Sequence, residues 1–146
     1  ATTTAMQTEV RLGPMGPDQP IVMVDDDELD REAAERGLKK SPITNPFMAF
    51  EDGSQFLDYL ESVIAGDAPF PAVVLLDINM PLMPGFDVLK QMRALPDFEE
   101  KPMVMMLTSS THDNDRKLSL QFGANDYLIK PHDYRDYSGF FEQLFA

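Results

Sequence analysis

The stretch Val73-Val74-Leu75-Leu76-Asp77-Ile78-Asn79-Met80-Pro81 decides how this chain is expected to fold. Four apolar residues run directly into an aspartate, and prolines stand on both sides of the stretch. A short apolar run between turn-forming residues is typical of a strand buried on both faces of a parallel sheet. Such open sheets bind ligands at the carboxyl ends of their strands. We therefore expect Asp77 to lie at a functional edge of a central strand.

Four more short apolar runs predict four further strands, at residues 21–24, 46–50, 102–107 and 126–129. A segment with helical spacing follows every strand, and Asp27 and Asp52 are suited to begin the first two helices as N-caps. The first helix is expected to bury Leu29, Ala33 and Leu38. Later helices are expected to bury Phe56, Leu57, Leu60, Val63, Ile64, Phe86, Leu89, Met92, Leu118, Leu120, Phe122, Tyr137, Phe140, Phe141, Leu144 and Phe145. Five strand–helix pairs predict a doubly wound α/β fold with a parallel sheet.

Length and composition limit the function classes. The chain has 146 residues, enough for one domain, which we place at residues 20–146 after a flexible tail at residues 1–19. Its net charge of −13 argues against binding of nucleic acid through the overall field. No apolar run reaches the ~18 residues that a membrane span needs, and no signal peptide is recognised. The absence of cysteine excludes thiolate metal sites and fits a cytoplasmic location.

Polar residues that can do chemistry follow four of the five predicted strands. They are Asp25 and Asp26, Asp77, Thr108 and Lys130. In a parallel sheet these strand ends share one edge, so residues more than a hundred positions apart become neighbours. Three converging carboxylates repel one another, and Mg²⁺, which prefers oxygen ligands, relieves that repulsion. Lys130 and Thr108 would complete a pocket for a phosphoryl group, with a carboxylate as the nucleophile.

Each of these residues also has an ordinary interpretation. Asp25, Asp26 and Asp27 can be acids at a helix start, Thr108 a strand-end residue, and Lys130 a solvated lysine. Asp77, directly after four apolar residues, is harder to explain structurally. The placement of all of them at strand ends favours the phosphoryl-transfer interpretation.

The sequence resembles a response-regulator receiver domain of two-component signalling, over residues 20–145. The resemblance rests on four motifs: Val24-Asp25-Asp26-Asp27, Leu76-Asp77-Ile78-Asn79-Met80-Pro81-Leu82-Met83-Pro84-Gly85, Leu107-Thr108-Ser109, and Tyr127-Leu128-Ile129-Lys130-Pro131. It implies a flavodoxin-like (βα)5 sandwich with strand order 2-1-3-4-5. Since no further domain follows the last helix, the chain is expected to be a stand-alone, CheY-like receiver or a piece of a longer protein.

The resemblance also implies residue roles. Asp77 would accept the phosphoryl group. Mg²⁺ would be bound by Asp26, Asp77 and the main-chain carbonyl of Asn79, with Asp25 acting through water. The phosphoryl oxygens would pair with Lys130 and Thr108, and Tyr127 would turn inward over the small Ser109 as part of the switch. Asn79 and Ser110 would influence the phosphoryl lifetime, and the bond before Pro131 would be cis.

Partners follow from the same resemblance. A sensor histidine kinase or a histidine phosphotransfer protein would supply the phosphoryl group. A protein target would bind the face of the fourth helix, fifth strand and last helix, with no nucleic acid or membrane partner. The domain would catalyse only its own phosphorylation and dephosphorylation, and would not be an enzyme otherwise. The aromatic residues of the last helix suit the core, with a homodimer interface as the alternative.

Two other functions fit parts of the same pattern. A Mg²⁺-dependent phosphohydrolase of the haloacid-dehalogenase type would use Asp25-x-Asp27, Thr108 and Lys130, but it would leave Asp77 and its loop unexplained and would lack a cap segment. A pseudo-receiver that binds partners without phosphorylation typically lacks one of the site residues, and none is missing here. The aspartate that becomes phosphorylated, Asp25 or Asp77, separates the hydrolase from the receiver.

Overall fold

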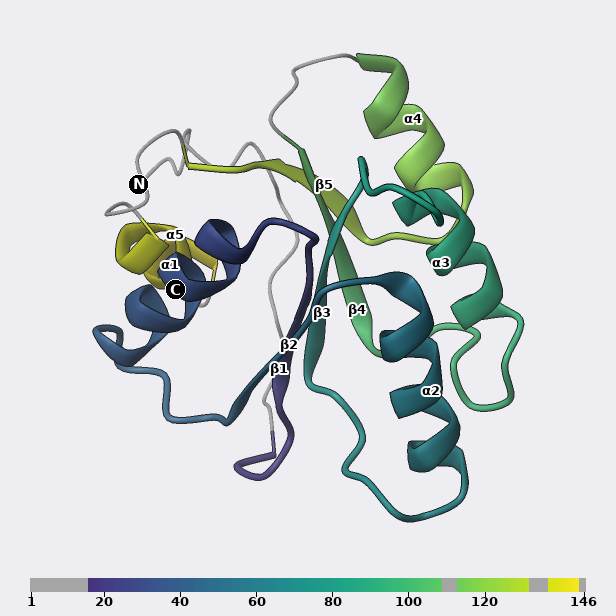
Figure 1. Cartoon of the computed structure of the whole chain (residues 1–146), viewed down its shortest axis with the longest axis horizontal. Helices are drawn as coiled ribbons and strands as arrows, with labels where there is room; N and C mark the ends of the chain where they lie inside the picture. The colour runs from purple at the N-terminus through teal and green to yellow at the C-terminus, as the bar shows by residue number, and fades with distance from the viewer. Residues whose placement is uncertain (1–15, 109–112, 132–136, 145–146) are drawn as a thin grey trace.

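A computed structural model describes residues 16–108, 113–131 and 137–144 of the chain. It confirms a five-stranded parallel sheet in the order β2-β1-β3-β4-β5, with strands and helices alternating along the chain (Figure 1). The strands are β1 (Ile21–Val24), β2 (Phe47–Phe50), β3 (Val73–Asp77), β4 (Met103–Thr108) and β5 (Asp126–Ile129). The helices are α1 (Glu28–Lys39), α2 (Gly53–Ile64), α3 (Gly85–Arg93), α4 (Asp113–Gln121) and α5 (Tyr137–Leu144).

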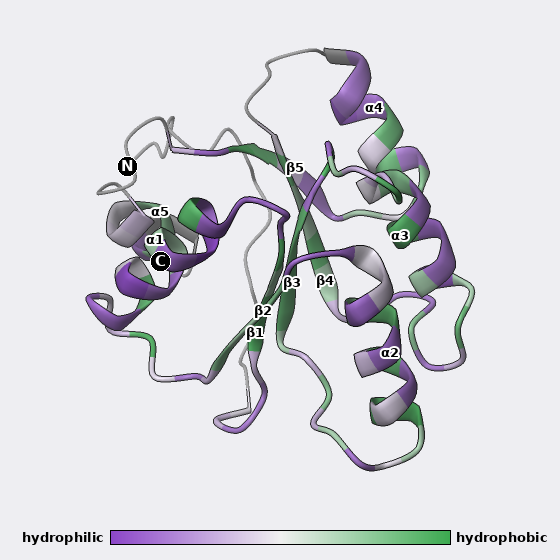
Figure 2. Cartoon of the chain, viewed as in Figure 1, coloured by the Kyte–Doolittle hydropathy of each residue, from purple (hydrophilic) through white to green (hydrophobic). Residues whose placement is uncertain are grey.

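The sheet lies between two helical layers. Helices α1 and α5 cover one face, and α2, α3 and α4 cover the other (Figure 1). Alternate residues of each strand point to opposite faces, so Ile21 and Met23 pack under α1 and α5, whereas Val22 and Val24 belong to the core under α2 and α3. The central strands are mostly hydrophobic and the outer helix surfaces mostly hydrophilic (Figure 2). Burial on both faces explains why the inner strands are continuous apolar runs.

The predicted N-caps are confirmed. The carboxylate of Asp27 accepts a hydrogen bond from the backbone N–H of Leu29, and that of Asp52 accepts one from Gln55, at 2.9 and 2.8 Å. These bonds satisfy helix N–H groups that have no partner within the helix. Both helices therefore begin where the sequence predicts.

Some predicted core positions are wrong. Leu29, Ile64 and Leu120 are exposed, at 57%, 42% and 47% of their surface. The buried face of α1 is instead formed by Asp30, Ala33, Ala34, Gly37 and Leu38. Neighbouring helical residues are about 100° apart, so the inward position of Asp30 turns Leu29 outward.

The predicted boundary at residue 20 stays a prediction. Within the described residues, the side-chain amide of Asn45 donates hydrogen bonds to the carbonyls of Gly16 and Gln19, each at 2.9 Å. Residues 1–15 lie outside the described residues, as do Ser109, Ser110 and Phe145. No helix in the described ranges is long and apolar enough to cross a bilayer.

Candidate functional site

The strand ends meet as the sequence predicts. Asp25 follows β1, Asp77 ends β3 and Thr108 ends β4, and all three are buried, whereas Asp26 is exposed. The parallel register pairs Asp77 with Leu107, directly before Thr108, and pairs Thr108 with Ile129, directly before Lys130. The polar groups therefore share one edge of the sheet.

Lys130 is the centre of the described site. Its Nζ atom lies 2.7 Å from Asp25 Oδ2, 3.2 Å from Asp30 Oδ2 and 3.5 Å from Asp77 Oδ1. The lysine side chain is only 13% exposed. The solvated-lysine interpretation is therefore wrong, because a buried ammonium is here shared by three carboxylates.

Three carboxylates form a cluster suited to a cation. Oxygen atoms of Asp25, Asp26 and Asp77 lie within 4.8 Å of one another. Asp25 Oδ1 accepts a hydrogen bond from the backbone N–H of Asp27 at 2.9 Å, while the buried Oδ2 is paired with Lys130 Nζ at 2.7 Å. Hard oxygen donors in this arrangement fit Mg²⁺ or Mn²⁺.

Burial and mutual repulsion control the charges at the site. Burial raises the pKa of Asp77 to about 7, and the charge of Asp25 adds to this rise. Burial likewise raises the pKa of Asp25, although Lys130 counteracts it. Burial alone would lower the pKa of Lys130, but the surrounding carboxylates outweigh it and the pKa is raised. The lysine therefore stays charged, and a further cation close to the carboxylates would favour their ionised forms.

The loop after Asp77 is fixed by backbone contacts. The N–H of Ile78 donates to the carbonyl of Leu107 at 2.9 Å, and the N–H of Gly85 donates to the carbonyl of Ile78 at 2.8 Å. A β-carbon at Gly85 would overlap the main-chain carbonyl oxygen of Asp77. Glycine is therefore required at this point, because α3 begins in direct contact with the site backbone.

Asp30 is the site residue that the sequence analysis missed. It is 7% exposed, and its Oδ1 accepts a hydrogen bond from the Tyr137 hydroxyl at 3.2 Å. The signal was present, since Asp30 precedes Ala33, Ala34 and Gly37 by three, four and seven positions. That is the spacing of a buried helical face, and an acidic residue on such a face requires a partner.

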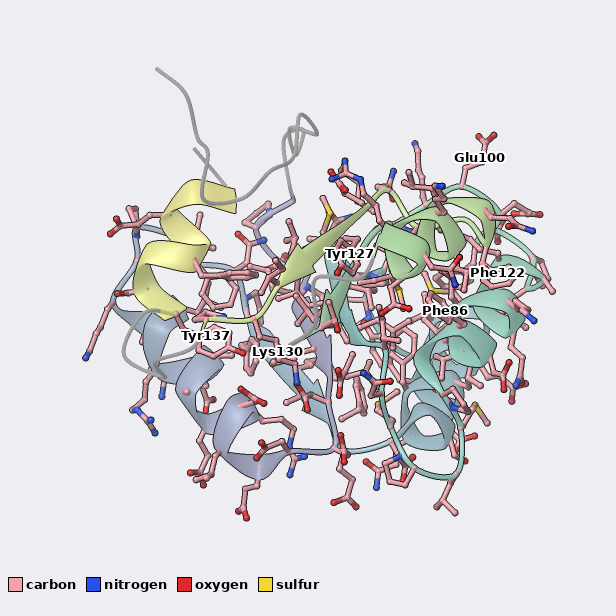
Figure 3. The ribbon with its side chains drawn as sticks, turned by 90° about the horizontal axis from the view of Figure 1, so that it is seen from above. Phe86, Glu100, Phe122, Tyr127, Lys130 and Tyr137 are labelled. Atoms are coloured by element: carbon pink, nitrogen blue, oxygen red, sulfur yellow. The ribbon has the colours of Figure 1, made fainter. Side chains whose placement is uncertain are left out.

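The other predicted site residues have mixed outcomes. Tyr127 is buried, 7% exposed, among the core residues of the α2, α3 and α4 layer (Figure 3), so the alternative of a half-exposed tyrosine is wrong. Asn79 is exposed in the loop after Asp77. The prediction of a cis bond before Pro131 is wrong. Within the described ranges, the peptide bond found in the cis form is Lys101–Pro102. An X-Pro sequence favours neither isomer strongly enough to identify which proline is cis.

Comparisons with known proteins agree with this geometry. Residues 21–138 match the sequence model of the response regulator receiver domain. The chain is 31% identical to the "Probable methanogenesis regulatory protein FilR2" of Methanothrix harundinacea, over 85% of this chain and 79% of that protein. It is 30% identical to response regulator Rcp1 of Synechocystis, over 82% of each chain.

Solved structures give the same result. The response regulator RPA3017 in red light signaling of R. palustris superposes with a TM-score of 0.76 at 28% identity, over 86% of this chain and 90% of that one. The Mn²⁺-bound form of Rcp1 superposes with a TM-score of 0.71 at 28% identity, over 83% and 90% of the two chains.

Proposed function

We propose that this chain, which belongs to the response regulator receiver domain family, accepts a phosphoryl group on Asp77 and signals through contact with other proteins. Receiver domains are signalling proteins of two-component systems rather than metabolic enzymes. The observation that carries the proposal is the buried Lys130, whose ammonium lies 3.5 Å from Asp77 and 2.7 Å from Asp25. That arrangement provides a carboxylate nucleophile beside a fixed positive charge.

A divalent cation is part of the proposal. Asp26 and Asp77 would bind Mg²⁺ directly, with the carbonyl of Asn79 as a further ligand. Both Asp25 oxygens already lie near other groups, Asp27 N–H and Lys130 Nζ, which supports a role for Asp25 through water. The Mn²⁺ in the structure of Rcp1 is a further support. When bound, the metal would neutralise negative charge on the carboxylates and on the transferred group.

The transfer itself is a displacement at phosphorus. An ionised oxygen of Asp77 forms the new P–O bond with its electron pair as the P–N bond of a phosphohistidine donor breaks, and the histidine nitrogen keeps that pair. Lys130 and Thr108 are proposed to bind two phosphoryl oxygens. In the described structure Thr108 is completely buried at the end of β4, close enough in register to Asp77 to take this role.

The alternatives are less well supported. In the phosphohydrolase pattern Asp27 would assist catalysis, but its carboxylate accepts the hydrogen bond of an N-cap. A pseudo-receiver would not need the ammonium of Lys130 beside Asp77. We retain both as outcomes of the experiment below.

The partners remain proposals. We propose a histidine kinase or a histidine phosphotransfer protein as donor, and a protein target on the α4–β5–α5 face. Tyr127 and Ser109 are proposed to take part in the switch with Thr108. The receiver boundaries, 20–146, and the cytoplasmic location stay predictions from the sequence.

Intact mass spectrometry tests the proposal. The protein is incubated with acetyl phosphate and Mg²⁺, with and without a chelator, and the adduct is located by peptide mapping. We expect one phosphoryl group on Asp77 that requires the metal, and none in Asp77→Asn. Asp58→Asn, at an exposed position on α2, is the matched control and should behave as the wild type.

Each other result has a definite meaning. An adduct on Asp25 with repeated turnover of donor would support the hydrolase instead. No adduct together with no release of phosphate from the donor would support the pseudo-receiver. Uptake by Asp77→Asn at the wild-type rate would overturn the assignment of Asp77.

A further inference from the structure

A polar chain of contacts leads from the site into the α1–α5 layer. Lys130 Nζ donates to Asp30 Oδ2 at 3.2 Å, and the Tyr137 hydroxyl donates to Asp30 Oδ1 at 3.2 Å. The aspartate comes from α1 and the tyrosine is the first residue of α5. Figure 3 shows Lys130 and Tyr137 near one another between these helices. Both oxygens of Asp30 are therefore used, one toward the site and one toward α5.

We propose that Asp30 is a positioning residue that competes with Asp77 for Lys130, together with Asp25. Tyr137 holds the Asp30 carboxylate in place. When a phosphoryl group on Asp77 attracts Lys130, the loss of the Lys130–Asp30 contact is transmitted through Tyr137 to α5. This inference rests on the proposed function. It adds a second connection from the phosphorylation site to the surface helices, separate from the proposed switch through Thr108 and Tyr127.

The distances show how the connection would respond. Lys130 lies closest to Asp25, next to Asp30 and farthest from Asp77, at 2.7, 3.2 and 3.5 Å. A phosphoryl group adds between one and two negative charges to the most distant partner. The ammonium of Lys130 is then attracted more strongly toward Asp77. Of its contacts with Asp25 and Asp30, the longer one, with Asp30, is expected to break first. Asp30 loses a hydrogen bond from its cation, and the Tyr137 hydroxyl remains its neutral donor.

Tyr137 is packed too closely for the Asp30 carboxylate to move without moving the tyrosine as well. Tyr137 is completely buried, and a β-carbon at Gly37 of α1 would lie 2.6 Å from Tyr137 Cβ and 2.7 Å from the backbone nitrogen of Ser138. The two helices are therefore in direct contact at the point where the hydrogen bond joins them. A shift of the Asp30 carboxylate acts on the first turn of α5.

The ordinary alternative is that Tyr137 only satisfies a buried carboxylate. That role predicts a loss of stability when the hydroxyl is removed, and nothing more. The proposal predicts in addition that two variants have opposite effects on anion binding. Asp30→Asn removes the negative charge that competes with the anion for Lys130. Tyr137→Phe leaves Lys130 as the remaining donor to Asp30 among the described contacts, so Asp30 competes more strongly with the anion.

The experiment uses beryllofluoride with Mg²⁺ as the phosphoryl mimic, titrated into the ¹⁵N-labelled full chain. The readouts are the apparent Kd and the chemical-shift change of the α5 amides. We expect Asp30→Asn to tighten binding and Tyr137→Phe to weaken it, each by about threefold, as for a modest hydrogen bond. In both variants the α5 shift changes should fall below half of those in the wild type. Tyr59→Phe, which removes another buried hydroxyl, is the matched control and should match the wild type.

The outcomes separate the two proposals. If the wild type binds no beryllofluoride and forms no adduct, the proposed function fails. If the wild type binds but both variants shift the Kd in the same direction, or α5 responds fully in Tyr137→Phe, only the present inference is overturned. Circular dichroism verifies that each variant is folded, and Asp30→Asn provides an independent answer should Tyr137→Phe not fold.

Discussion

On the face of the sheet covered by α1 and α5, a chain of charged and hydrogen-bonded side chains leads out of the site, whereas on the other face the end of α4 meets α3 through aromatic contacts. The first face has Lys130, Asp30 and Tyr137 in sequence. The second face has the ring of Phe122, after α4, 5.5 Å from that of Phe86 on α3, with Lys90 Nζ 4.5 Å from the Phe122 ring centroid. Figure 3 shows the two groups on opposite sides of the molecule.

The difference concerns how each layer can respond to a new charge. Hydrogen bonds to an ionised group depend strongly on distance and direction, so a small movement of Lys130 changes them. Aromatic contacts are spread over many atoms, so they depend less on the position of one charged group. The α1–α5 layer is therefore suited to sensing charge, and the aromatic contacts of the α3–α4 layer are less sensitive to it.

Gly85→Ala should have the largest effect, because Gly85 begins α3 in direct contact with the backbone of Asp77. Its β-carbon would overlap the Asp77 carbonyl oxygen and lie 2.9 Å from Ile78 Cα, and neither backbone atom can move without displacing Asp77. We expect the free energy of unfolding to fall by about 3 kcal/mol, as measured by urea denaturation, and adduct formation on Asp77 to slow.

Gly66→Ala is the comparison for that variant. Gly66 has a φ of +84°, but nothing lies within 4 Å of its β-carbon position. Only the backbone conformation opposes the substitution, at a cost of about 1 kcal/mol. Equal losses in the two variants would mean that contact with the Asp77 backbone is unimportant.

Gly37→Ala should have the next largest effect and is confined to the α1–α5 layer. Alanine favours a helix over glycine by about 1 kcal/mol, but here its β-carbon would collide with Tyr137 and the Ser138 backbone. We expect a net loss of about 2 kcal/mol in the free energy of unfolding. In α5, Gly139 has open space around its β-carbon position, so Gly139→Ala should instead gain about 0.5–1 kcal/mol. The same sign for both would show that the two helices are not in close contact.

The sequence predicted the parallel sheet and its polar edge because those features depend on local patterns. Apolar runs of four to six residues define the strands, and residues directly after them must meet at one edge once the sheet is parallel. That is why Asp25, Asp77, Thr108 and Lys130 were all found together at the correct edge. The order of the strands in the sheet could not be predicted from these local patterns and came from the family resemblance.

Features that depend on tertiary contacts could not be predicted from local sequence patterns. Asp30 lies in the first turn of α1, where acids are common, although its spacing from Ala33 and Ala34 places it on the buried face. Its partner Tyr137 lies more than a hundred residues away, so no local pattern joins them. Leu29 was expected on a shared apolar face with Ala33 and Leu38, but Asp30 lies on the buried side, where it pairs with Lys130, and Leu29 is exposed.

Phe122→Leu should have a smaller effect in the other layer. It removes the ring that contacts Phe86 and Lys90 but retains an apolar side chain at a half-buried position. We expect a loss of about 1 kcal/mol in the free energy of unfolding, the size of one aromatic pair. Leu120→Ala, at an exposed position on α4, should lose less than about 0.5 kcal/mol. A larger loss at Leu120 than at Phe122 would contradict the importance of the Phe122 contacts with Phe86 and Lys90.

The smallest expected effect is the coupling between the layers, measured with the double variant Tyr137→Phe/Phe122→Leu. The two side chains belong to opposite faces of the sheet and share no contact among the described residues, so their effects on unfolding should add to within about 0.5 kcal/mol. The same cycle with beryllofluoride bound tests whether the site joins the layers, since a coupling that appears only with the anion must pass through the residues of the site. Coupling of equal size without the anion would mean that the sheet itself transmits the effect. The distinction between a charge-sensing layer and a less charge-sensitive one would then fail.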